Sequence, residues 1–472
     1  MLGIALHEYG AALQFKIQLC NLPRELRDHE VLVQVQAASI NPMDCKLRSG
    51  ALQQLYPLSL PVILGCDMSG VVVKAGNKAP FSPGQHVFGR QTLERIREVN
   101  GAYAEFCVAD GKDLCLKPED VSFEDAAAVP WAGLTALGAI EHTGGIGYKN
   151  STGGRRAVLV LGGSGGVGSL AIQIAKHYMR CYVAATASTV NQRFLKELGA
   201  DEAINYTDPD FWSGIQKPQL GQGKEGFNLV IDCVGGDDYW ERAQELLTDD
   251  GHYVTLVGPH RYGSDAMTVG SALNTQMTSN IRKGLGLLGA SKKYTVFTPS
   301  MTKSEDLEVL SKLLKENTIT PTISKVYSMY DIMDAHEHMD SHHAVGKCIL
   351  QVRKGVPEDD KDEGSQPDED DDNVDLRDMV LDKETMRLVP RSKANQSGMG
   401  DDLKKQQMEV AARLLRCSEC VNSLARHLFR CAPLNLCSQD QGSEAEWGCG
   451  LCRCSPRNLL PLLRTWVSLS MI

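Results

Sequence analysis

Hydrophobic and polar residues alternate along the first part of the chain in the pattern of half-buried strands. The stretch VLVQVQA at 31–37 alternates strictly, and residues 70–76 and 85–89 look similar, with glycine at the turns. A period of two residues places one face of a strand in the core and the other toward solvent. Because stretches of helical period are scarce there, residues 1–125 are expected to form a strand-rich module.

After residue 126, short apolar runs take turns with stretches of helical period. Short apolar runs are typical of buried strands, and longer amphipathic stretches are typical of helices. The expected strands are 157–161, 181–186, 228–234 and 252–257, and the expected helices are 166–178, 190–198 and 239–248. This alternation predicts an α/β fold built from βαβ units around a doubly wound parallel sheet.

The remaining segments are less regular. Residues 206–226 are polar and contain glycine and lysine, which predicts a loop. A helix is expected at 304–316, and KCILQVRK at 347–354 predicts a closing strand. From residue 355 onward the chain is acidic and poor in aromatic residues, a composition typical of disorder.

The net charge of −10 is unevenly distributed along the 472 residues. Residues 358–372 hold ten acidic residues and one lysine, so the first 354 residues are only mildly acidic. No basic patch indicates a nucleic-acid partner, and no run reaches the roughly 20 apolar residues of a membrane helix. The N-terminal stretch MLGIALHEYG has neither the basic segment of a signal peptide nor the composition of a transit peptide.

The 15 cysteines fall into two groups. Eight are scattered through the first 354 residues, as expected for reduced intracellular thiols. The other seven are Cys417, Cys420, Cys431, Cys437, Cys449, Cys452 and Cys454. They include two C-x-x-C pairs, which keep a zinc site open. Because 28 residues separate Cys420 from Cys449, longer than the usual interval, a poorly ordered extension is the favoured interpretation.

A glycine cluster follows the apolar run 157–161 and carries the strongest chemical signal. Gly163, Gly165 and Gly168 match G-x-G-x-x-G, and a helix is expected from about Val167. Without side chains, such a turn lets a diphosphate approach the backbone, where the helix N-terminus offers free N–H groups. A strand, this turn and a helix in succession predict a dinucleotide site. Its expected contacts are Gly163, Ser164, Gly165, Gly166, Val167 and Gly168.

The end of the next strand favours NADPH over NADH. An NAD site usually places an acidic residue there, but ATASTVNQR at 185–193 contains none. Ser188 can hydrogen-bond a 2′-phosphate, and Arg193 can supply positive charge. Tyr206 is expected beside the adenosine. The alternative is that Arg193 is a solvated helix residue and Tyr206 a tyrosine at the rim of a strand.

Several stretches in order resemble the medium-chain dehydrogenase/reductase family, in its zinc-free quinone-oxidoreductase branch. They are ASINPMDCKLRSG at 38–50, LGCDMSGVV at 64–72, AAVPWAGLTAL at 127–137, VLVLGGSGGVG at 158–168 and LGADEAINY at 198–206. The resemblance implies a GroES-like β-rich catalytic domain interrupted by a Rossmann domain. The expected segments are 1–125 (GroES-like), 126–270 (Rossmann), 271–354 (return to the catalytic domain), 355–400 (acidic disordered linker) and 401–472 (Cys-rich extension).

The resemblance also implies roles for single residues. Asn41 and Thr135 would lie near the nicotinamide, and the residues expected to close over the cofactor are Ala344, Val345 and Gly346. Tyr56, Tyr103 and Trp131 are candidate walls for a flat acceptor, although such residues are more often part of a core. Asp44 and Arg48, four residues apart, are expected to pair on one helix face as scaffolding.

Zinc is not expected. Zinc dehydrogenases of this family use a cysteine where Asn41 stands, and a His-Glu pair where Cys66 and Asp67 stand. A weaker hypothesis takes Cys45, Cys66, Asp67 and His86 as ligands. Without a metal to polarise a carbonyl, the chemistry left is hydride transfer to a quinone or an α,β-unsaturated carbonyl, which supplies its own electron sink.

A second hypothesis is an NADPH-binding redox sensor or scaffold protein that turns over slowly and recruits partners through its C-terminal tail. The family subgroup implies a mitochondrial location, although no transit peptide is visible, and the cytoplasm is the alternative. A homodimer and a basic partner for the acidic residues 358–372 stay open.

Overall fold

The computed structural model describes residues 1–21, 25–143, 156–221, 224–260, 269–298, 301–352, 379–382 and 387–390. The chain divides into two compact units, Met1–Lys361 and Asp362–Ile472. In the second unit the described residues form a hairpin of β19 (Met379–Asp382) and β20 (Arg387–Pro390). The other residues of the expected linker, and all seven C-terminal cysteines, lie outside the described residues.

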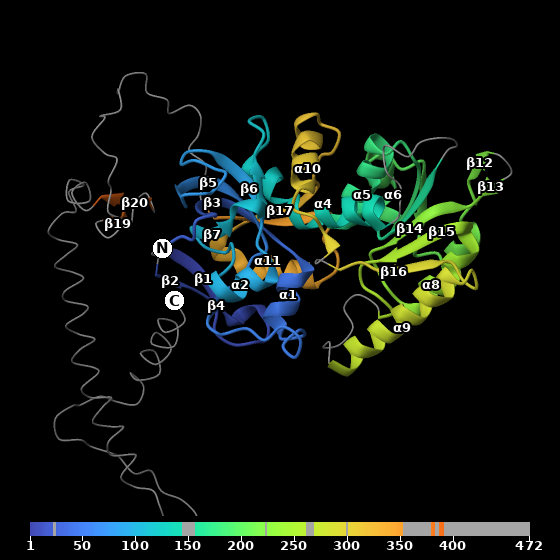
Figure 1. The fold of residues 1–472 in the computed structure, drawn as a ribbon, viewed down its shortest axis with the longest axis horizontal. Helices are drawn as coiled ribbons and strands as arrows, with labels where there is room; N and C mark the ends of the chain where they lie inside the picture. Colours follow the sequence, from blue (N-terminus) through green and yellow to red (C-terminus); the bar gives the residue numbers. More distant parts are fainter. Residues whose placement is uncertain are drawn as a thin grey trace, which may run out of the picture. The chain divides into compact units, whose positions relative to one another are not determined.

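The first module is rich in strands, as the alternating pattern predicts (Figure 1). Its main sheet has the order β17-β18-β3-β5-β6-β8, with β7 also paired to β3. The strands contributed by the N-terminal residues are β3 (Glu30–Ile40), β5 (Asp67–Ala75), β6 (His86–Arg90), β7 (Phe106–Asp110) and β8 (Leu114–Leu116). In β3, Val33 and Val35 are fully buried, whereas Gln34 and Gln36, which alternate with them, are partly exposed. The polar positions of the pattern are thus the solvent-facing ones.

Smaller elements complete this module. A second sheet has the order β2-β1-β4, and three short helices lie between the strands. These elements are β1 (Leu2–Leu6), β2 (Phe15–Leu19), β4 (Val62–Ile63), α1 (Pro42–Ser49), α2 (Leu93–Val99) and α3 (Phe123–Ala127). The core between them contains Ile4, Leu64 and Met68, all completely buried.

The second module contains a parallel sheet with the order β11-β10-β9-β14-β15-β16. Its strands are β9 (Ala157–Leu161), β10 (Tyr182–Ala187), β11 (Glu202–Asn205), β14 (Phe227–Asp232), β15 (Leu247–Thr255) and β16 (Lys293–Val296). All five residues of β9 are completely buried, because helices cover both faces of a parallel sheet. This is the strand order of a Rossmann domain, and the fold class is confirmed.

Helices surround this sheet (Figure 1). They are α4 (Pro130–Leu137), α5 (Gly166–Gln173), α6 (Gln192–Glu197), α8 (Asp237–Leu246), α9 (Val269–Leu287) and α10 (Asp306–Lys315). A π-helical turn, Ile174–Tyr178, extends α5 and completes the expected helix 166–178. Leu170 and Ile174 are buried, as their helical spacing predicts.

Three features of this module differ from the sequence expectation. The region 206–226 contains α7 (Phe211–Gly214) and a hairpin of β12 (Gln219–Gly221) and β13 (Lys224–Glu225), rather than a plain loop. Its apolar residues Ile215 and Leu220 are buried in the core, which holds the segment down. Helix α9 was not expected, and β16 follows it. The expected boundary at residue 270 therefore separates the parallel sheet from its sixth strand.

The C-terminal strands return to the first module. β18 (Lys347–Gln351) pairs antiparallel with β3, from Cys348 opposite Ile40 to Gln351 opposite Ala37. β17 (Ile323–Ser328) adds a parallel strand beside it, and α11 (Ile332–Asp340) connects the two. The expected closing strand is confirmed, and it brings residues near 346 beside the glycine turn.

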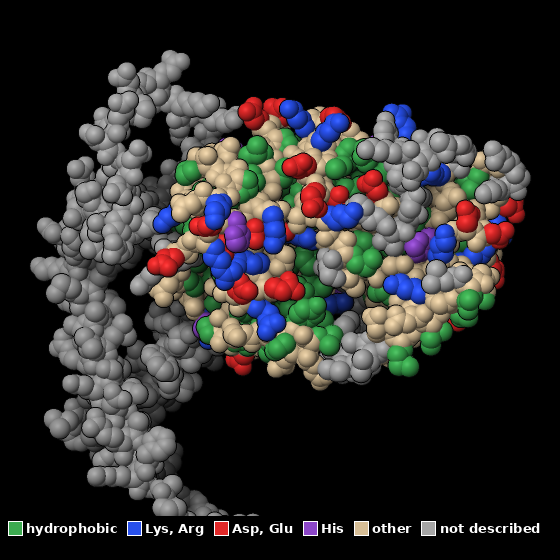
Figure 2. Space-filling model, in the orientation of Figure 1, with side chains coloured by type: hydrophobic (Ala, Val, Ile, Leu, Met, Phe, Trp, Pro, Cys, Tyr) green, Lys and Arg blue, Asp and Glu red, His purple; other side chains and the backbone are tan. Residues whose placement is uncertain are grey.

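The surface of the described residues has mixed charge. Figure 2 shows acidic and basic side chains interspersed over the visible face, without a broad area of one sign. Within the described ranges, no helix is both long and apolar enough to cross a membrane.

Candidate functional site

The glycine turn between β9 and α5 is packed so closely that side chains are excluded from part of it. Gly162 has φ +80°, a backbone conformation that favours glycine. A Cβ atom on Gly168 would lie 2.2 Å from the carbonyl oxygen of Gly162 and 2.8 Å from Cα of Gly163. The turn is fixed to β10 by the N–H of Gly163, which donates to the carbonyl oxygen of Thr186 across 2.8 Å. The start of α5 therefore lies directly against the end of β9.

The outer side of the same turn is open. A Cβ atom on Gly165 would meet its nearest neighbour, the carbonyl oxygen of Gly162, at 3.7 Å. Helix α5 begins at Gly166, with Gly165 as its N-cap, and the first N–H groups of a helix have no intrahelical acceptor. Ser164, Gly166 and Val167 are half-buried at this opening. The turn is therefore open at Gly165, and we call this opening the cradle.

The segment Ala344–Gly346 forms the neighbouring wall of this cradle. The N–H of Gly346 donates to the carbonyl oxygen of Ser164 across 2.9 Å, and Gly346 forms a parallel bridge with Gly165. Gly346 has φ +80°, and a Cβ atom there would lie 2.1 Å from the carbonyl oxygen of Thr322. The return of β18 thus brings together two stretches that are far apart in the sequence.

Ser188 and Tyr206 lie at the ends of the adjacent strands β10 and β11. The N–H of Tyr206 donates to the carbonyl oxygen of Ala187 across 3.1 Å, which holds Tyr206 beside Ser188. The Tyr206 side chain is half-exposed. Arg193 is 91% exposed, and its Nε donates to Oε1 of Glu197 across 2.8 Å. The structure therefore brings Ser188 and Tyr206 together, while Arg193 extends into solvent on α6.

A buried polar cluster adjoins the cradle. The carboxylate of Asp67, which is completely buried, accepts hydrogen bonds from Ser39 Oγ at 2.8 Å and from Asn41 Nδ2 at 2.9 Å. Its other oxygen accepts the backbone N–H of Trp131 at 2.9 Å. The ammonium of Lys347 lies 2.5 Å from Asn41 Oδ1 and 3.4 Å from Asp67 Oδ2. The cluster contains a buried charge pair surrounded by neutral donors.

A second buried carboxyl group, that of Asp44, lies in the first turn of α1. Asp44 accepts the backbone N–H of Asn41 at 2.9 Å and the thiol of Cys66 at 3.2 Å. Burial raises the pKa of Asp44 to about 6, against the opposing effect of these hydrogen bonds. The expected pair of Asp44 with Arg48 is wrong. Arg48 instead reaches across to α11, where its guanidinium lies 2.5 Å from the carboxylate of Asp340.

Tyr103 belongs to the core rather than to an open pocket. Its side chain is completely buried, and its ring packs edge-on against Phe15 and His336, with centroids 6.4 and 5.8 Å away. His336 is also buried, and its Nδ1 lies 3.3 Å from the thiol of Cys45. Burial, with the nearby charge of Arg48, lowers the pKa of His336 to about 3. Tyr103 therefore offers no surface to an acceptor in this structure.

The other predicted site residues are Thr135 and Trp131 on α4 and Tyr56 in the first module. The hydroxyl of Thr135 donates to the carbonyl oxygen of Trp131 across 2.7 Å, one turn earlier in α4. Trp131 and Tyr56 are half-buried and pack against the first core. Since Asp67 binds the N–H of Trp131, the structure connects α4 to Asn41.

The residues of the weaker zinc hypothesis do not converge. Cys45 contacts His336, Cys66 contacts Asp44, and Asp67 contacts Lys347. The exposed ring of His86 packs against that of Phe123, 5.1 Å away. No three His, Cys, Asp or Glu side chains in the described part of the chain are grouped to hold a metal ion.

Sequence reasoning missed Lys347 and Ser39. The stretch HHAVGK at 342–347 contains Lys347, but lysine is almost never completely buried, and nothing in the sequence indicates its partners. The only available signal is position, because Lys347 directly follows the segment expected to close over the cofactor. Ser39 lies near the end of β3, and Asn41 follows this strand directly with an extended backbone, so the two side chains, two residues apart, point to the same side.

Two family models match the chain. The alcohol dehydrogenase GroES-like domain matches residues 27–119, and the zinc-binding dehydrogenase model matches residues 198–350. Among relatives, the mitochondrial NAD(P)H oxidoreductase RTN4IP1 of Danio rerio is 30% identical over 353 residues, covering 70% of this chain and 85% of that protein. The 2-methylene-furan-3-one reductase of Solanum lycopersicum is 31% identical over 350 residues, covering 73% of this chain and 77% of that protein.

A solved structure also matches the fold of this chain. The quinone oxidoreductase of Escherichia coli, complexed with NADPH, matches with a TM-score of 0.59 at 25% identity, covering 75% of this chain and 100% of that one. Three stretches of this sequence resemble reticulon-4-interacting protein 1: DCVGG at 232–236, YVTLVGP at 253–259 and HHAVGK at 342–347. The match to RTN4IP1 confirms that resemblance. By its domains and its relatives, the chain belongs to the medium-chain dehydrogenase/reductase family.

Proposed function

We propose that this chain is an NADPH-dependent, zinc-independent reductase that transfers a hydride to a quinone or an α,β-unsaturated carbonyl. The observation that carries the proposal is the glycine turn held against Gly346, beside the buried cluster of Asn41, Asp67 and Lys347. The turn gives a dinucleotide a cradle of backbone amides. The cluster gives the adjacent wall a buried polar geometry fixed by hydrogen bonds.

The residues present fit NADPH. The open side of Gly165 and the first turn of α5 would hold the diphosphate, and Ala344–Gly346 would close over it. Ser188 would donate to the 2′-phosphate, Arg193 would add charge, and Tyr206 would lie beside the adenosine. The Escherichia coli quinone oxidoreductase, whose structure contains NADPH, supports this choice. When bound, the cofactor supplies the hydride.

The residues next to this cradle indicate where an acceptor would bind. Asn41 and Thr135 would position the nicotinamide and its ribose, while Tyr56 and Trp131 offer flat apolar surface to an acceptor. A quinone or an enone takes up a hydride and a proton without a metal, so the protein mainly positions it and excludes water. The tomato relative is named as a reductase of 2-methylene-furan-3-one, and the Escherichia coli structure as a quinone oxidoreductase, which supports both acceptor classes.

Turnover measurements test the proposal. The full chain is incubated with NADPH and a panel of quinones and enones, and oxidation of the cofactor is followed by its absorbance. A saturated ketone of similar size is the control, because it lacks the conjugated electron sink. We expect oxidation with quinones or enones and none with the saturated ketone. Binding of NADPH without turnover of any acceptor would favour the redox sensor or scaffold, and absence of binding would contradict both.

The location and partners belong to the same proposal. The name of the Danio rerio relative supports a mitochondrial location, which fractionation of cells that express the full chain distinguishes from the cytoplasm. A homodimer is tested by the mass of the purified protein in solution. A partner for the acidic residues 358–372 is tested by deleting them and comparing the proteins retained.

A further inference from the structure

Lys347 is a buried lysine that lies against the glycine turn and contacts Asn41, one of the predicted catalytic residues. Its side chain is 5% exposed, and its ammonium lies 2.5 Å from Asn41 Oδ1 and 3.4 Å from Asp67 Oδ2. A Cβ atom on Gly166 would lie 2.7 Å from Cδ of Lys347, so the lysine stem runs along the first residue of α5. One side chain therefore spans from the glycine turn to Asn41.

The ammonium determines which way the Asn41 amide points. Lys347 donates to Oδ1 of Asn41, and Nδ2 of Asn41 donates to Oδ2 of Asp67. If the amide rotated by half a turn, its NH₂ group would face the ammonium and its oxygen would face the carboxylate. Both contacts would be repulsive in a buried site, where charges are weakly screened. The amide is thus held in one orientation from both ends.

Lys347 also connects Asn41 to the cradle, because its backbone lies beside the glycine turn. Gly346, the residue before Lys347, donates its N–H to the carbonyl oxygen of Ser164. The N–H of Lys347 itself donates to the carbonyl oxygen of Thr322 at 2.8 Å. The backbone of Lys347 is therefore anchored beside the glycine turn, while its ammonium is anchored to Asn41, the N-cap of α1, and to Asp67 on β5.

We propose that Lys347 is a positioning residue, which holds the Asn41 amide in its productive orientation and holds the Gly346 wall against the glycine turn. The expected effect of Lys347 on turnover rests on the proposed function. Its expected effect on NADPH binding does not depend on which acceptor, if any, is reduced. The charge of Lys347 contributes to both tasks, because the ammonium orients the Asn41 amide and its contacts with Asn41 and Asp67 tie the residue after Gly346 to the first module.

Lys347→Met tests the proposal, because methionine keeps an apolar stem and removes the ammonium. We expect kcat/KM for quinone reduction to fall roughly 10- to 100-fold, as for other displacements of positioned groups. We also expect the Kd for NADPH, measured by fluorescence, to rise about tenfold, which corresponds to about 1.4 kcal/mol.

A double-mutant cycle separates positioning from simple stabilisation. In an Asn41→Ala background the amide that Lys347 orients is gone, so at saturating NADPH Lys347→Met should lower kcat/KM for the quinone by less than about twofold further. If the two losses multiply instead, Lys347 does not act through Asn41, and the proposal is overturned. Should the wild-type chain bind NADPH without reducing any acceptor, the proposed function fails, and the Kd for NADPH decides the inference alone. A wild-type Kd in a folded Lys347→Met variant would then overturn it.

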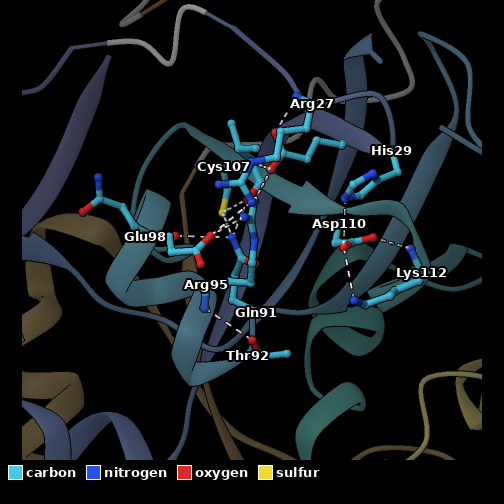
Figure 3. A network of polar contacts seen from close by, with 12 residues as sticks. Arg27, His29, Gln91, Thr92, Arg95, Glu98, Cys107, Asp110 and Lys112 are labelled. Carbon is cyan, nitrogen blue, oxygen red and sulfur yellow. Dashed lines mark hydrogen bonds and ion pairs between the residues drawn. The ribbon is translucent and has the colours of Figure 1, made fainter. Parts of the chain in front are cut away.

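Arg95 provides a matched control. It lies on α2 in the network of Figure 3 and forms a buried pair with Glu30 at 2.7 Å, outside the cofactor site. Arg95→Met also removes one cation from a buried pair. We expect it to lower the melting temperature while leaving the Kd for NADPH and kcat/KM within about twofold. An equal loss of activity in Arg95→Met would show that removing any buried cation has this effect, and it would overturn the proposal.

A neutral pair variant covers the case in which Lys347→Met does not fold. Lys347→Met combined with Asp67→Asn removes both buried charges, and such paired replacements are tolerated better than single ones. The Asn41 amide is released in this variant too, so we expect the loss of NADPH affinity to persist. A folded pair variant with wild-type affinity and activity would contradict the inference.

Discussion

The backbone N–H of Trp131 donates to the carboxylate of Asp67 across 2.9 Å and thereby fastens the first turn of helix α4 to strand β5. The same carboxylate is the counter-charge of Lys347. A helix N-terminus favours a negative charge, so Asp67 stabilises α4 in addition to neutralising the lysine. Since α4 also carries Thr135, this one carboxylate sets the position of two predicted site residues relative to Asn41.

Asp67→Asn should therefore destabilise the protein strongly. The variant leaves the Lys347 ammonium buried without a counter-charge, a situation that costs about 3–5 kcal/mol in other proteins. Urea denaturation measures the free energy of unfolding. The exposed Asp208→Asn, which removes the same charge from the surface, should change it by less than about 0.5 kcal/mol. Similar effects of the two variants would contradict the importance given to the buried pair.

Gly168→Ala should damage the cradle although it adds one methyl group. The new Cβ would lie 2.2 Å from the carbonyl oxygen of Gly162, so α5 must move away from β9. We expect the Kd for NADPH to rise at least about tenfold and the stability to fall by about 1–3 kcal/mol. Gly214→Ala is the control, because a Cβ there has no neighbour within 4 Å. Unchanged NADPH affinity in Gly168→Ala would contradict the cradle.

The sequence predicts the fold well wherever one period dominates. The run 157–161 matches β9 residue for residue, because a strand buried on both faces is continuously apolar. Helix α9 was missed since three of its apolar residues, Met277, Ile281 and Leu285, are exposed, as is Leu288 directly after it. A helix with apolar residues on its outer side lacks the amphipathic contrast on which the prediction depends.

The site is predicted only in part, for a different reason. The glycine turn is local, so its strand, turn and helix are all visible in one stretch of sequence. The cluster of Asn41, Asp67 and Lys347 joins strands far apart in the chain, and no local pattern shows that a lysine after Gly346 is buried. The Asp44–Arg48 pair was wrong for the same reason, because Arg48 reaches Asp340 on α11, which helix spacing does not reveal.

The raised pKa of Asp44 predicts a pH dependence of stability. Its pKa of about 6 in the folded state lies above the ordinary 3.8, so the folded protein binds this proton more tightly than the unfolded chain does. The stabilisation is complete below about pH 4 and is lost as the pH rises through 6. From about pH 5 to about pH 7 the unfolding free energy should fall by about 1 kcal/mol on account of this group.

Asp44→Asn isolates that contribution. Asparagine keeps an acceptor for the N–H of Asn41 and does not titrate. The difference in unfolding free energy between wild type and Asp44→Asn should therefore change by about 1 kcal/mol across that pH range. Asp249→Asn, at an exposed position, gives the background from general charge effects. A pH-independent difference for Asp44→Asn would show that the carboxyl group does not titrate in this range.

Arg193 is the residue expected to supply positive charge for the 2′-phosphate of NADPH. Its guanidinium is held by Glu197 across 2.8 Å in the free protein, yet it is 91% exposed and can leave that partner at little cost. If it binds the 2′-phosphate, Arg193→Ala should raise the Kd for NADPH about tenfold, a typical loss for a charge-assisted hydrogen bond. The Kd for NADH should stay within about twofold, because NADH has no phosphate there.

Glu197→Ala should have the opposite effect on NADPH affinity. An opposite effect would show that the loss in Arg193→Ala does not come from a general disturbance of α6. Removal of the carboxylate frees Arg193 and removes a repulsive charge, so NADPH should bind about two- to threefold more tightly. Lys196→Ala is the control for net charge, since its ammonium bonds to the carbonyl oxygen of Asp201 instead. It should leave the ratio of the two Kd values unchanged. If Arg193→Ala and Lys196→Ala weaken NADPH equally, the preference comes from diffuse charge, and Arg193 is a solvated helix residue.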